Sequence, residues 1–317
     1  MRKVMLGLSL IVLLPLLGSC IHSAIYTARV ETAHPAEGQR VLVNGSAVHV
    51  QTDGSSGPAV LMIHGASANS NEFDWSLSPL LANDHRVFMA DRPGHGHSDR
   101  HAGSDELEVQ AAQLAGAMDK LAPGEKMVVV GHSFGGAVAL RFALDHPDKV
   151  SALVLLAPVS HDWGGGGVAW YNNWAGSPLI GPAFSQLVPI VGPNSAKQGV
   201  AGTFHPQSAP DGYYEKSGVP LLFRPKTFRA NAQDVLNLQD ELRAQSERYP
   251  EIKVPVVLYS GRKDTVIKPS LHSGRLNRQL ENVTLVDLPE TGHMPHHIHS
   301  ADIAETIRQL ASGEQPG

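Results

Sequence analysis

The sequence predicts an α/β fold in which helices cover both faces of a mostly parallel sheet. Continuous apolar runs alternate along the chain with segments of helical spacing, and this is the pattern of a sheet buried on both faces. One run ends in Gly-x-Ser-x-Gly, and a glycine- and proline-rich segment without strand character interrupts the alternation. With 317 residues, of which 42% are hydrophobic, the chain can bury a sizeable core.

The expected strands and helices follow one another in a clear order. Asn44-Gly45 between two short alternating runs predicts a β-hairpin. Six continuous apolar runs come after it, at residues 59–63, 86–90, 127–130, 150–156, 254–259 and 283–288. Helical spacing is found at residues 107–121, 137–144 and 301–310. These elements assign residues 41–160 and 251–312 to one core and residues 161–250 to an insertion.

The first 20 residues predict a signal, lipoprotein or anchor segment. Two basic residues precede an apolar stretch over residues 4–17, as in a secretory signal. The stretch ends at Leu17-Gly18-Ser19-Cys20, which resembles the lipobox of bacterial lipoproteins, whose cysteine is lipidated. An uncleaved anchor and a plain secretory signal are the alternatives. All three predict a membrane-associated protein on the extracytoplasmic side of a bacterial envelope, with residues 21–40 as a tether.

Composition argues against several other kinds of site. Cys20 is the only cysteine, so no internal disulfide is possible. The net charge is −5 and no basic block is present, which argues against nucleic-acid binding. Four histidines gather near the C-terminus, without paired acidic ligands or H-E-x-x-H spacing: His293, His296, His297 and His299. We therefore expect no metal, and we expect the last three histidines to line an entrance or face solvent.

Five short motifs follow expected strands. They are His64-Gly65, Asp91 to Ser98, Gly131 to Gly135, Gly261 to Asp264 and Gly292-His293. Because of these motifs, residues 41–310 resemble a cap-bearing serine hydrolase of the α/β-hydrolase family. The resemblance implies an eight-stranded, mostly parallel sheet with an inserted helical cap, and a nucleophile, an acid and a histidine in that chain order.

Ser133, at the centre of Gly-x-Ser-x-Gly, is the expected nucleophile. A serine hydroxyl needs a base to take its proton, and His293 after the last expected strand suits that role. A carboxylate must hold the base in one tautomer. Asp264 suits this position, and Asp162 is the alternative because some relatives carry the acid there.

The oxyanion formed on attack needs two donors that are in place beforehand. Phe134 supplies a backbone N–H at the start of the helix, and the resemblance implies Ala66 as the second donor. We expect His64 to brace this loop and His132 to pack beneath the serine turn.

A serine nucleophile favours acyl transfer, because relatives that open epoxides or displace halide carry an aspartate at this position. We expect a carboxylesterase that acts on small to medium apolar esters and needs no cofactor. A cofactor-free perhydrolase, a carbon–carbon bond hydrolase, and a non-catalytic ligand-binding or signalling protein of the same fold are the alternatives. Trp163, Trp170 and Trp174 predict an aromatic substrate pocket in the cap, or else contacts that join cap and core.

Overall fold

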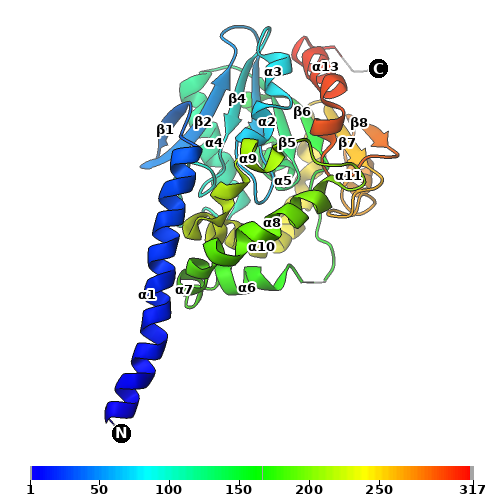
Figure 1. Ribbon diagram of the computed structural model, residues 1–317. Helices are drawn as coiled ribbons and strands as arrows, with labels where there is room; N and C mark the ends of the chain where they lie inside the picture. Colours follow the sequence, from blue (N-terminus) through cyan, green and yellow to red (C-terminus); the bar gives the residue numbers. More distant parts are fainter. Residues whose placement is uncertain (1, 166, 315–317) are drawn as a thin grey trace.

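The computed structural model describes residues 2–165 and 167–314, with side chains from Pro15 onward. At its centre lies an eight-stranded sheet with the order β1-β2-β4-β3-β5-β6-β7-β8 (Figure 1). Strand β2 is antiparallel to both of its neighbours, and the remaining neighbours are parallel. The predicted α/β fold with a mostly parallel sheet is confirmed.

The strands coincide with the expected apolar runs. Their bounds are β1 (Gln39–Val43), β2 (Ser46–Asp53), β3 (Ala59–Ile63), β4 (Arg86–Ala90), β5 (Met127–His132), β6 (Val150–Leu156), β7 (Val256–Gly261) and β8 (Val283–Leu288). Central strands β3 and β5 are buried at every position, because helices cover both of their faces.

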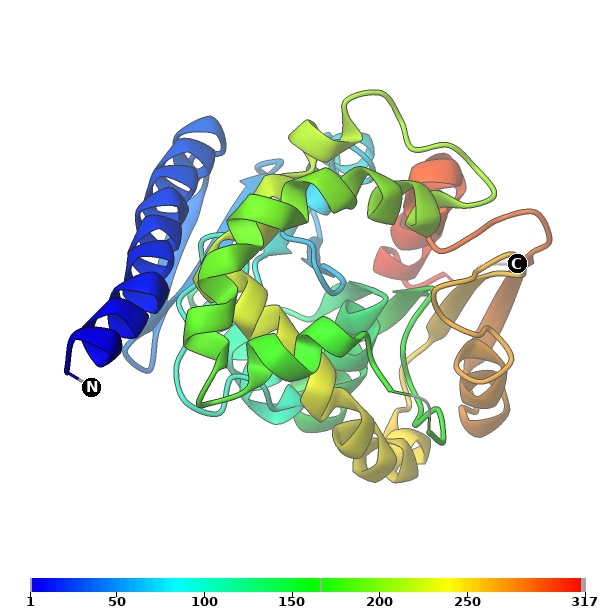
Figure 2. The same ribbon diagram turned by 60° about the horizontal axis from the view of Figure 1, so that its bottom comes forward.

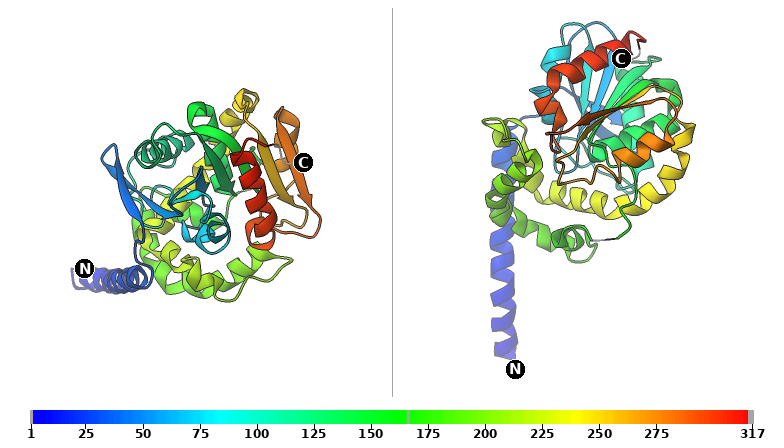
Figure 3. Two further views of the ribbon diagram at one scale, coloured as in Figure 1. Left: turned by 90° about the horizontal axis from the view of Figure 1, so that it is seen from above. Right: turned by 90° about the vertical axis from the view of Figure 1, so that its right-hand side faces the viewer.

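Helices form a layer on each face of the sheet (Figure 3). One apolar core cluster contains side chains of α4 (Leu107–Leu121), α5 (Phe134–Asp145) and α11 (Ser273–Gln279). A second cluster, on the other face, contains side chains of α2 (Asn71–Asp74), α3 (Ser78–Leu81) and α13 (Ser300–Ala311). The short helix α12 (Pro295–Ile298) precedes α13.

A helical insertion between β6 and β7 forms a cap beside the sheet (Figure 2). It contains α6 (Trp170–Gly176), α7 (Gly181–Phe184), α8 (Val188–Phe204), α9 (Tyr213–Lys216) and α10 (Pro225–Gln245). The loop after β3 binds this cap, since the Ser67 N–H donates to Asn231 Oδ1 at 2.6 Å. The carboxyl edge of the sheet, where ligands bind in parallel α/β folds, therefore faces the cap.

Helix α1 (Arg2–Ala33) replaces much of the expected tether, because it remains helical as far as Ala33. It also docks on the cap. The Ser23 hydroxyl donates to the Gln186 carbonyl at 2.7 Å, and the Tyr26 hydroxyl donates to the Pro220 carbonyl at 3.0 Å. Residues three and four apart adjoin on a helix, so the buried Val30 lies on the same face.

The expected signal segment falls largely outside the described side chains, which begin at Pro15. Within the part that is described, no helix combines the length and the apolar character needed to span a bilayer.

Candidate active site

Ser133 occupies a strained turn between β5 and α5. Its backbone angles, φ 51° and ψ −116°, lie in a region that residues other than glycine rarely adopt. A Cβ at Gly131 would lie 2.5 Å from the Gly135 carbonyl oxygen, and one at Gly135 would lie 2.1 Å from the Ile63 carbonyl oxygen. Close packing of strand and helix therefore requires glycine on both sides of the serine.

Asp264 and His293 form a buried hydrogen-bonded pair. His293 Nδ1 donates to Asp264 Oδ2 at 2.7 Å. The backbone N–H groups of Val266 and Ile267 donate to Asp264 Oδ1 at 2.8 and 2.9 Å, so the carboxylate is held in place. Burial lowers the pKa of His293, although the bond to Asp264 opposes the shift. The ring is therefore neutral at pH 7, with Nε2 free of the bond to Asp264 and able to accept a proton.

This pair lies beside the serine turn. His132, which precedes Ser133, donates from Nε2 to the His293 carbonyl oxygen at 3.0 Å, and the two ring centroids are 4.9 Å apart. Gly65 approaches from another side, where an added Cβ would lie 3.2 Å from the Ser133 Cβ. The fold thus brings the expected serine, histidine and acid to one place beside the loop after β3.

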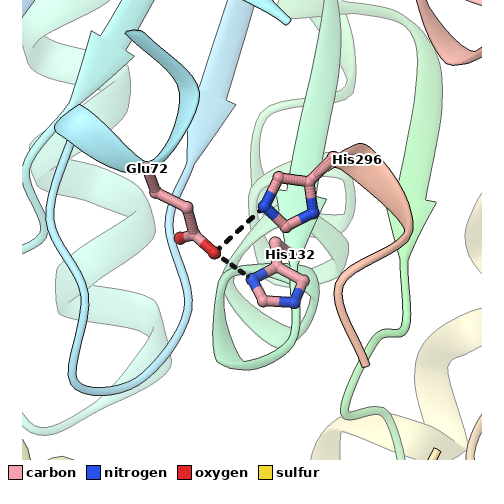
Figure 4. Close-up of side chains that lie close together, drawn as sticks. All are labelled: Glu72, His132 and His296. Carbon is pink, nitrogen blue, oxygen red and sulfur yellow. Dashed lines mark ion pairs between the residues drawn. The ribbon is translucent and has the colours of Figure 1, made fainter. Parts of the chain in front are cut away.

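A buried carboxylate, Glu72, connects three segments around Ser133. Figure 4 shows it directed at two imidazole rings, those of His132 and His296. Glu72 Oε1 pairs with His132 Nδ1 and lies 3.3 Å from His296 Nε2, and Oε2 accepts a hydrogen bond from the Gly65 N–H at 3.1 Å. Nothing in the residue pattern around Glu72 predicted this role.

Glu72 and His132 form an ion pair in which His296 is the neutral third member. Burial opposes the charge of Glu72, but His132 outweighs it and holds the pKa of Glu72 well below its usual range. Burial also opposes the charge of His132, but Glu72 raises the pKa of that ring above its ordinary value. Burial lowers the pKa of His296 to about 4. His296 is completely buried, so the expectation that it lines an entrance or faces solvent is wrong.

The same three side chains are the donor types that a metal ion would use. Each offers one ligand atom, and these atoms lie within 4.8 Å of one another. Opposite charges on Glu72 and His132 account for their contact as an ion pair.

The loop after β3 carries the backbone expected to bind the oxyanion. His64 is completely buried, donates from Nδ1 to the Gly65 carbonyl at 2.8 Å, and accepts the Arg92 N–H at Nε2 at 3.0 Å. Burial and the charge of Arg92 lower the pKa of His64 to about 4, so the ring is a neutral brace. Gly65 lies against Ser133. Ala66 follows Gly65 in the chain and Phe134 follows Ser133, so both expected oxyanion donors are next to this contact.

A second buried ion pair joins the edge of the core to the cap. Arg92 and Asp234 have no exposed side-chain surface, and Arg92 Nη1 lies 2.7 Å from Asp234 Oδ2. Arg100 donates to the other oxygen of Asp234 at 2.9 Å. The Arg92 guanidinium also lies 4.1 Å from the ring centre of Phe134. The sequence motif that contains Arg92 did not predict its contacts with Asp234 and Phe134.

The alternative acid, Asp162, is engaged elsewhere. Its Oδ2 pairs with Arg243 at 3.0 Å, and its Oδ1 accepts a hydrogen bond from Gln239 at 2.6 Å. Both partners belong to α10, so Asp162 joins the cap to the end of β6 while Asp264 is bonded to His293.

The three cap tryptophans, predicted to line a substrate pocket or to join cap and core, differ in exposure. Trp170 and Trp174 are 68% and 52% exposed, with their rings toward Phe184. Trp163 is partly buried against the larger core cluster. The exposure follows from the position of α6 on the outer side of the cap (Figure 1).

The chain is similar to known hydrolases both in sequence and in fold. Residues 58–300 match the sequence profile of the alpha/beta hydrolase fold family. A pimeloyl-[acyl-carrier protein] methyl ester esterase of Neisseria meningitidis is 28% identical over 268 residues, covering 80% of this chain and 93% of the relative. A 2-hydroxy-6-oxononadienedioate/2-hydroxy-6-oxononatrienedioate hydrolase of Cupriavidus pinatubonensis is 33% identical over 139 residues, covering 42% and 45%. The structure of an esterase from Exiguobacterium antarcticum superposes with a TM-score of 0.67 at 22% identity, covering 87% of this chain and 99% of that one.

Proposed function

Because the chain belongs to the α/β-hydrolase fold family, we propose that this hydrolase is a serine carboxylesterase acting on small to medium apolar esters. The observation that carries the proposal is the 2.7 Å bond between His293 and Asp264, formed beside the strained turn of Ser133. The esterase relative and the esterase of the same fold support an ester substrate.

The first half of the reaction is acylation of Ser133. His293 Nε2 takes the hydroxyl proton as Oγ attacks the ester carbonyl, and Asp264 stabilises the imidazolium that forms. The backbone N–H groups of Ala66 and Phe134 receive the oxyanion. When the tetrahedral intermediate collapses, His293 returns the proton to the leaving alcohol, and the acyl group remains on Ser133.

The second half is hydrolysis of the acyl-enzyme. His293 removes a proton from water, whose oxygen attacks the acyl carbon, and the same two backbone donors receive the second oxyanion. Collapse breaks the bond to Ser133 Oγ, which regains a proton from His293, and the carboxylic acid leaves. Asp264 is the better acid for this cycle, since Asp162 is bonded to Arg243 and Gln239.

A fluorophosphonate probe tests the nucleophile. We expect covalent labelling of the full chain, and loss of that labelling in Ser133→Ala. Failure to label contradicts the proposal and favours a non-catalytic ligand-binding protein, and labelling that survives the substitution contradicts Ser133 as the nucleophile. Turnover of p-nitrophenyl esters of increasing acyl length then defines the substrate, with the highest kcat/KM expected for short and medium chains.

Carbon–carbon bond hydrolysis is the second candidate. This candidate is favoured by the 2-hydroxy-6-oxononadienedioate/2-hydroxy-6-oxononatrienedioate hydrolase, which is 33% identical to this chain over 42% of its length. Cleavage of a vinylogous 1,5-diketone with no turnover of any p-nitrophenyl ester is the outcome that selects this candidate. A cofactor-free perhydrolase uses the same residues and is recognised by peracid formation from hydrogen peroxide and a carboxylic acid.

We also propose that the N-terminal segment holds the protein at the cell envelope, with Cys20 as the lipidated residue. The lipobox-like Leu17-Gly18-Ser19-Cys20 supports this, as does the exposure of Cys20 on α1. Mass spectrometry of the mature protein tests it: a diacylglyceryl-modified Cys20 at the N-terminus is expected. An unmodified Met1 excludes the lipoprotein and leaves the uncleaved anchor.

A further inference from the structure

A long uncharged stretch forms the first half of the cap. Residues 163–196 contain no aspartate, glutamate, lysine, arginine or histidine, although 17% of the whole chain is charged. The segment includes α6, α7 and the start of α8. A surface segment of a water-soluble cap normally carries charges at intervals, so this composition calls for another explanation.

The uncharged stretch leaves large apolar side chains exposed. Leu179 is 89% and Val191 63% exposed. Other residues of the same stretch with exposed apolar or aromatic side chains are Trp170, Tyr171, Trp174, Ile180, Leu187 and Ile190. We call this set, from Trp170 to Val191, the apolar cap face. Scattered exposed apolar residues are ordinary, but a set this dense and uncharged is typical of an interaction surface.

Helix α1 extends the apolar cap face. On the part of the helix that follows Cys20, it exposes Ile21 and Ile25. The bond from Ser23 to the Gln186 carbonyl fixes these residues beside the cap, because Gln186 lies within the uncharged stretch. Figure 1 shows the N-terminal half of α1 projecting past α7, on the side of the molecule that carries α6 and α8.

We propose that the apolar cap face and the adjoining part of α1 together dock on a lipid bilayer. Lipid tails need no polar partner, whereas a protein partner is normally bound through a polar rim that includes charged residues, and this stretch contains none of those. Tryptophan rings also favour the membrane–water boundary.

Docking on the bilayer depends on apolar contact with lipid and not on attraction between charges. The net charge of −5 gives no attraction to anionic lipid. Binding to phosphatidylcholine vesicles is therefore expected to be at least as strong as binding to vesicles that contain phosphatidylglycerol, and added salt should not weaken it.

Site-specific fluorescence tests the proposal without any enzyme assay, so its outcome is independent of the chemistry proposed for Ser133. The full chain carrying C20S receives one new cysteine, at L179C or V191C on the apolar cap face or at D302C on α13. Asp302 has a 78% exposed side chain and belongs to α13, which lies at the end of the molecule opposite to α6 and α7 in Figure 1. Each cysteine is labelled with an environment-sensitive dye.

Phosphatidylcholine vesicles should shift the emission of the dyes at positions 179 and 191 to the blue, and a nitroxide on the acyl chains should quench both several-fold. The dye at position 302 should do neither. The proposal is overturned if the protein does not bind the vesicles, or if it binds them while the dyes at positions 179 and 191 stay unshifted and unquenched. A blue shift that rises with protein concentration before vesicles are added also overturns it, because a second copy then covers this face.

A charged double variant gives an independent measurement. L179D combined with V191D should weaken vesicle binding at least about tenfold, since two exposed apolar groups no longer enter the lipid. Hydrolysis of a soluble p-nitrophenyl ester should be unchanged. L285D is the matched control, because Leu285 is 36% exposed on β8, away from α1 (Figure 1). Equal vesicle affinity of the double variant and the control contradicts the docking surface.

Discussion

The imidazole of His132 donates a hydrogen bond to the backbone carbonyl of His293 at 3.0 Å. The residue before the candidate nucleophile therefore holds the loop that carries the candidate base. His132 is in turn paired with Glu72, whose other oxygen accepts the Gly65 N–H beside the expected oxyanion donor. One buried carboxylate thus positions all three segments that have to converge on a substrate.

Glu72→Gln should destabilise the protein and lower kcat more than it raises KM. The free energy of unfolding should fall by about 3–5 kcal/mol, the cost of breaking a buried ion pair. Asp84→Asn is the matched control, because Asp84 pairs with His85 and Arg308 at the surface and should contribute less than about 1 kcal/mol. Urea unfolding of both variants at pH 5.5 measures the difference.

The destabilisation caused by Glu72→Gln should depend on pH in a predictable direction. The folded-state pKa of Glu72 is depressed, so its contribution to stability is present above the ordinary pKa of 4.5 and is lost as the pH falls through the folded-state pKa. The folded-state pKa of His132 is raised, so its contribution is complete below 6.5 and is lost as the pH rises through the folded value. The largest difference between wild type and variant is expected between pH 4.5 and 6.5. A difference that grows steadily toward pH 9 contradicts the ion pair.

Asp264→Asn should lower kcat about 10³- to 10⁴-fold, because the base loses the carboxylate that fixes its tautomer. Asp162→Asn makes the same chemical change at the alternative acid and should leave kcat within about twofold, since Asp162 binds Arg243 at the surface. Steady-state kinetics with a p-nitrophenyl ester measure both variants. A large loss in Asp162→Asn with little loss in Asp264→Asn would reverse the assignment of the acid.

The pH dependence of kcat/KM should show that the base, His293, is already unprotonated in weakly acidic solution. Burial lowers the pKa of His293 below its ordinary value of 6.5, and the bond to Asp264 opposes this shift. Activity requires the unprotonated ring, so kcat/KM is expected to rise with pH along a single titration whose midpoint lies below 6.5. A midpoint above 6.5 means that Asp264 outweighs burial in the free enzyme.

Gly135→Ala should be destabilising and should abolish activity. The new Cβ would lie 2.1 Å from the Ile63 carbonyl oxygen, which belongs to a central strand that cannot move aside. Gly199→Ala on α8 is the matched control, because no atom lies within 4 Å of its added Cβ. Alanine in a helix interior should stabilise that variant by about 0.5–1 kcal/mol. Thermal unfolding and ester hydrolysis distinguish the two variants.

The sheet was predictable because burial on both faces leaves a continuous apolar run in each central strand, as in Val128-Val129-Val130. The places of Ser133, Asp264 and His293 were predictable as well, because each follows a strand in a recognisable turn. Glu72 was not, because its importance comes from contacts with His132 and His296, which are far away in sequence. A charged residue on a four-residue helix carries no sign of burial.

The docking of α1 was not predictable for a related reason. The face that meets the cap consists of Ser19, Ser23, Tyr26 and Val30, of which only one is aliphatic. The more apolar residues, Ile21 and Ile25, point away from the protein. Helical spacing of hydrophobic residues would therefore predict the opposite face as the buried one. The orientation of α1 is instead set by the hydroxyls of Ser23 and Tyr26, which donate hydrogen bonds to carbonyl groups of the cap.

The ion pair of Arg92 and Asp234 should control how firmly the cap is held. Both groups are completely buried, so Asp234→Ala leaves the Arg92 charge without its main partner and should cost about 3–5 kcal/mol of unfolding free energy. Arg92→Met combined with Asp234→Leu removes both buried charges and should recover part of that stability, since two apolar side chains replace the pair while Arg100 still loses its bond to Asp234. Arg92 also lies against Phe134, the expected oxyanion donor, so the double variant should remain less active than the wild type even when it is as stable. Urea unfolding together with ester hydrolysis separates the two effects, and a double variant less stable than Asp234→Ala alone contradicts the argument.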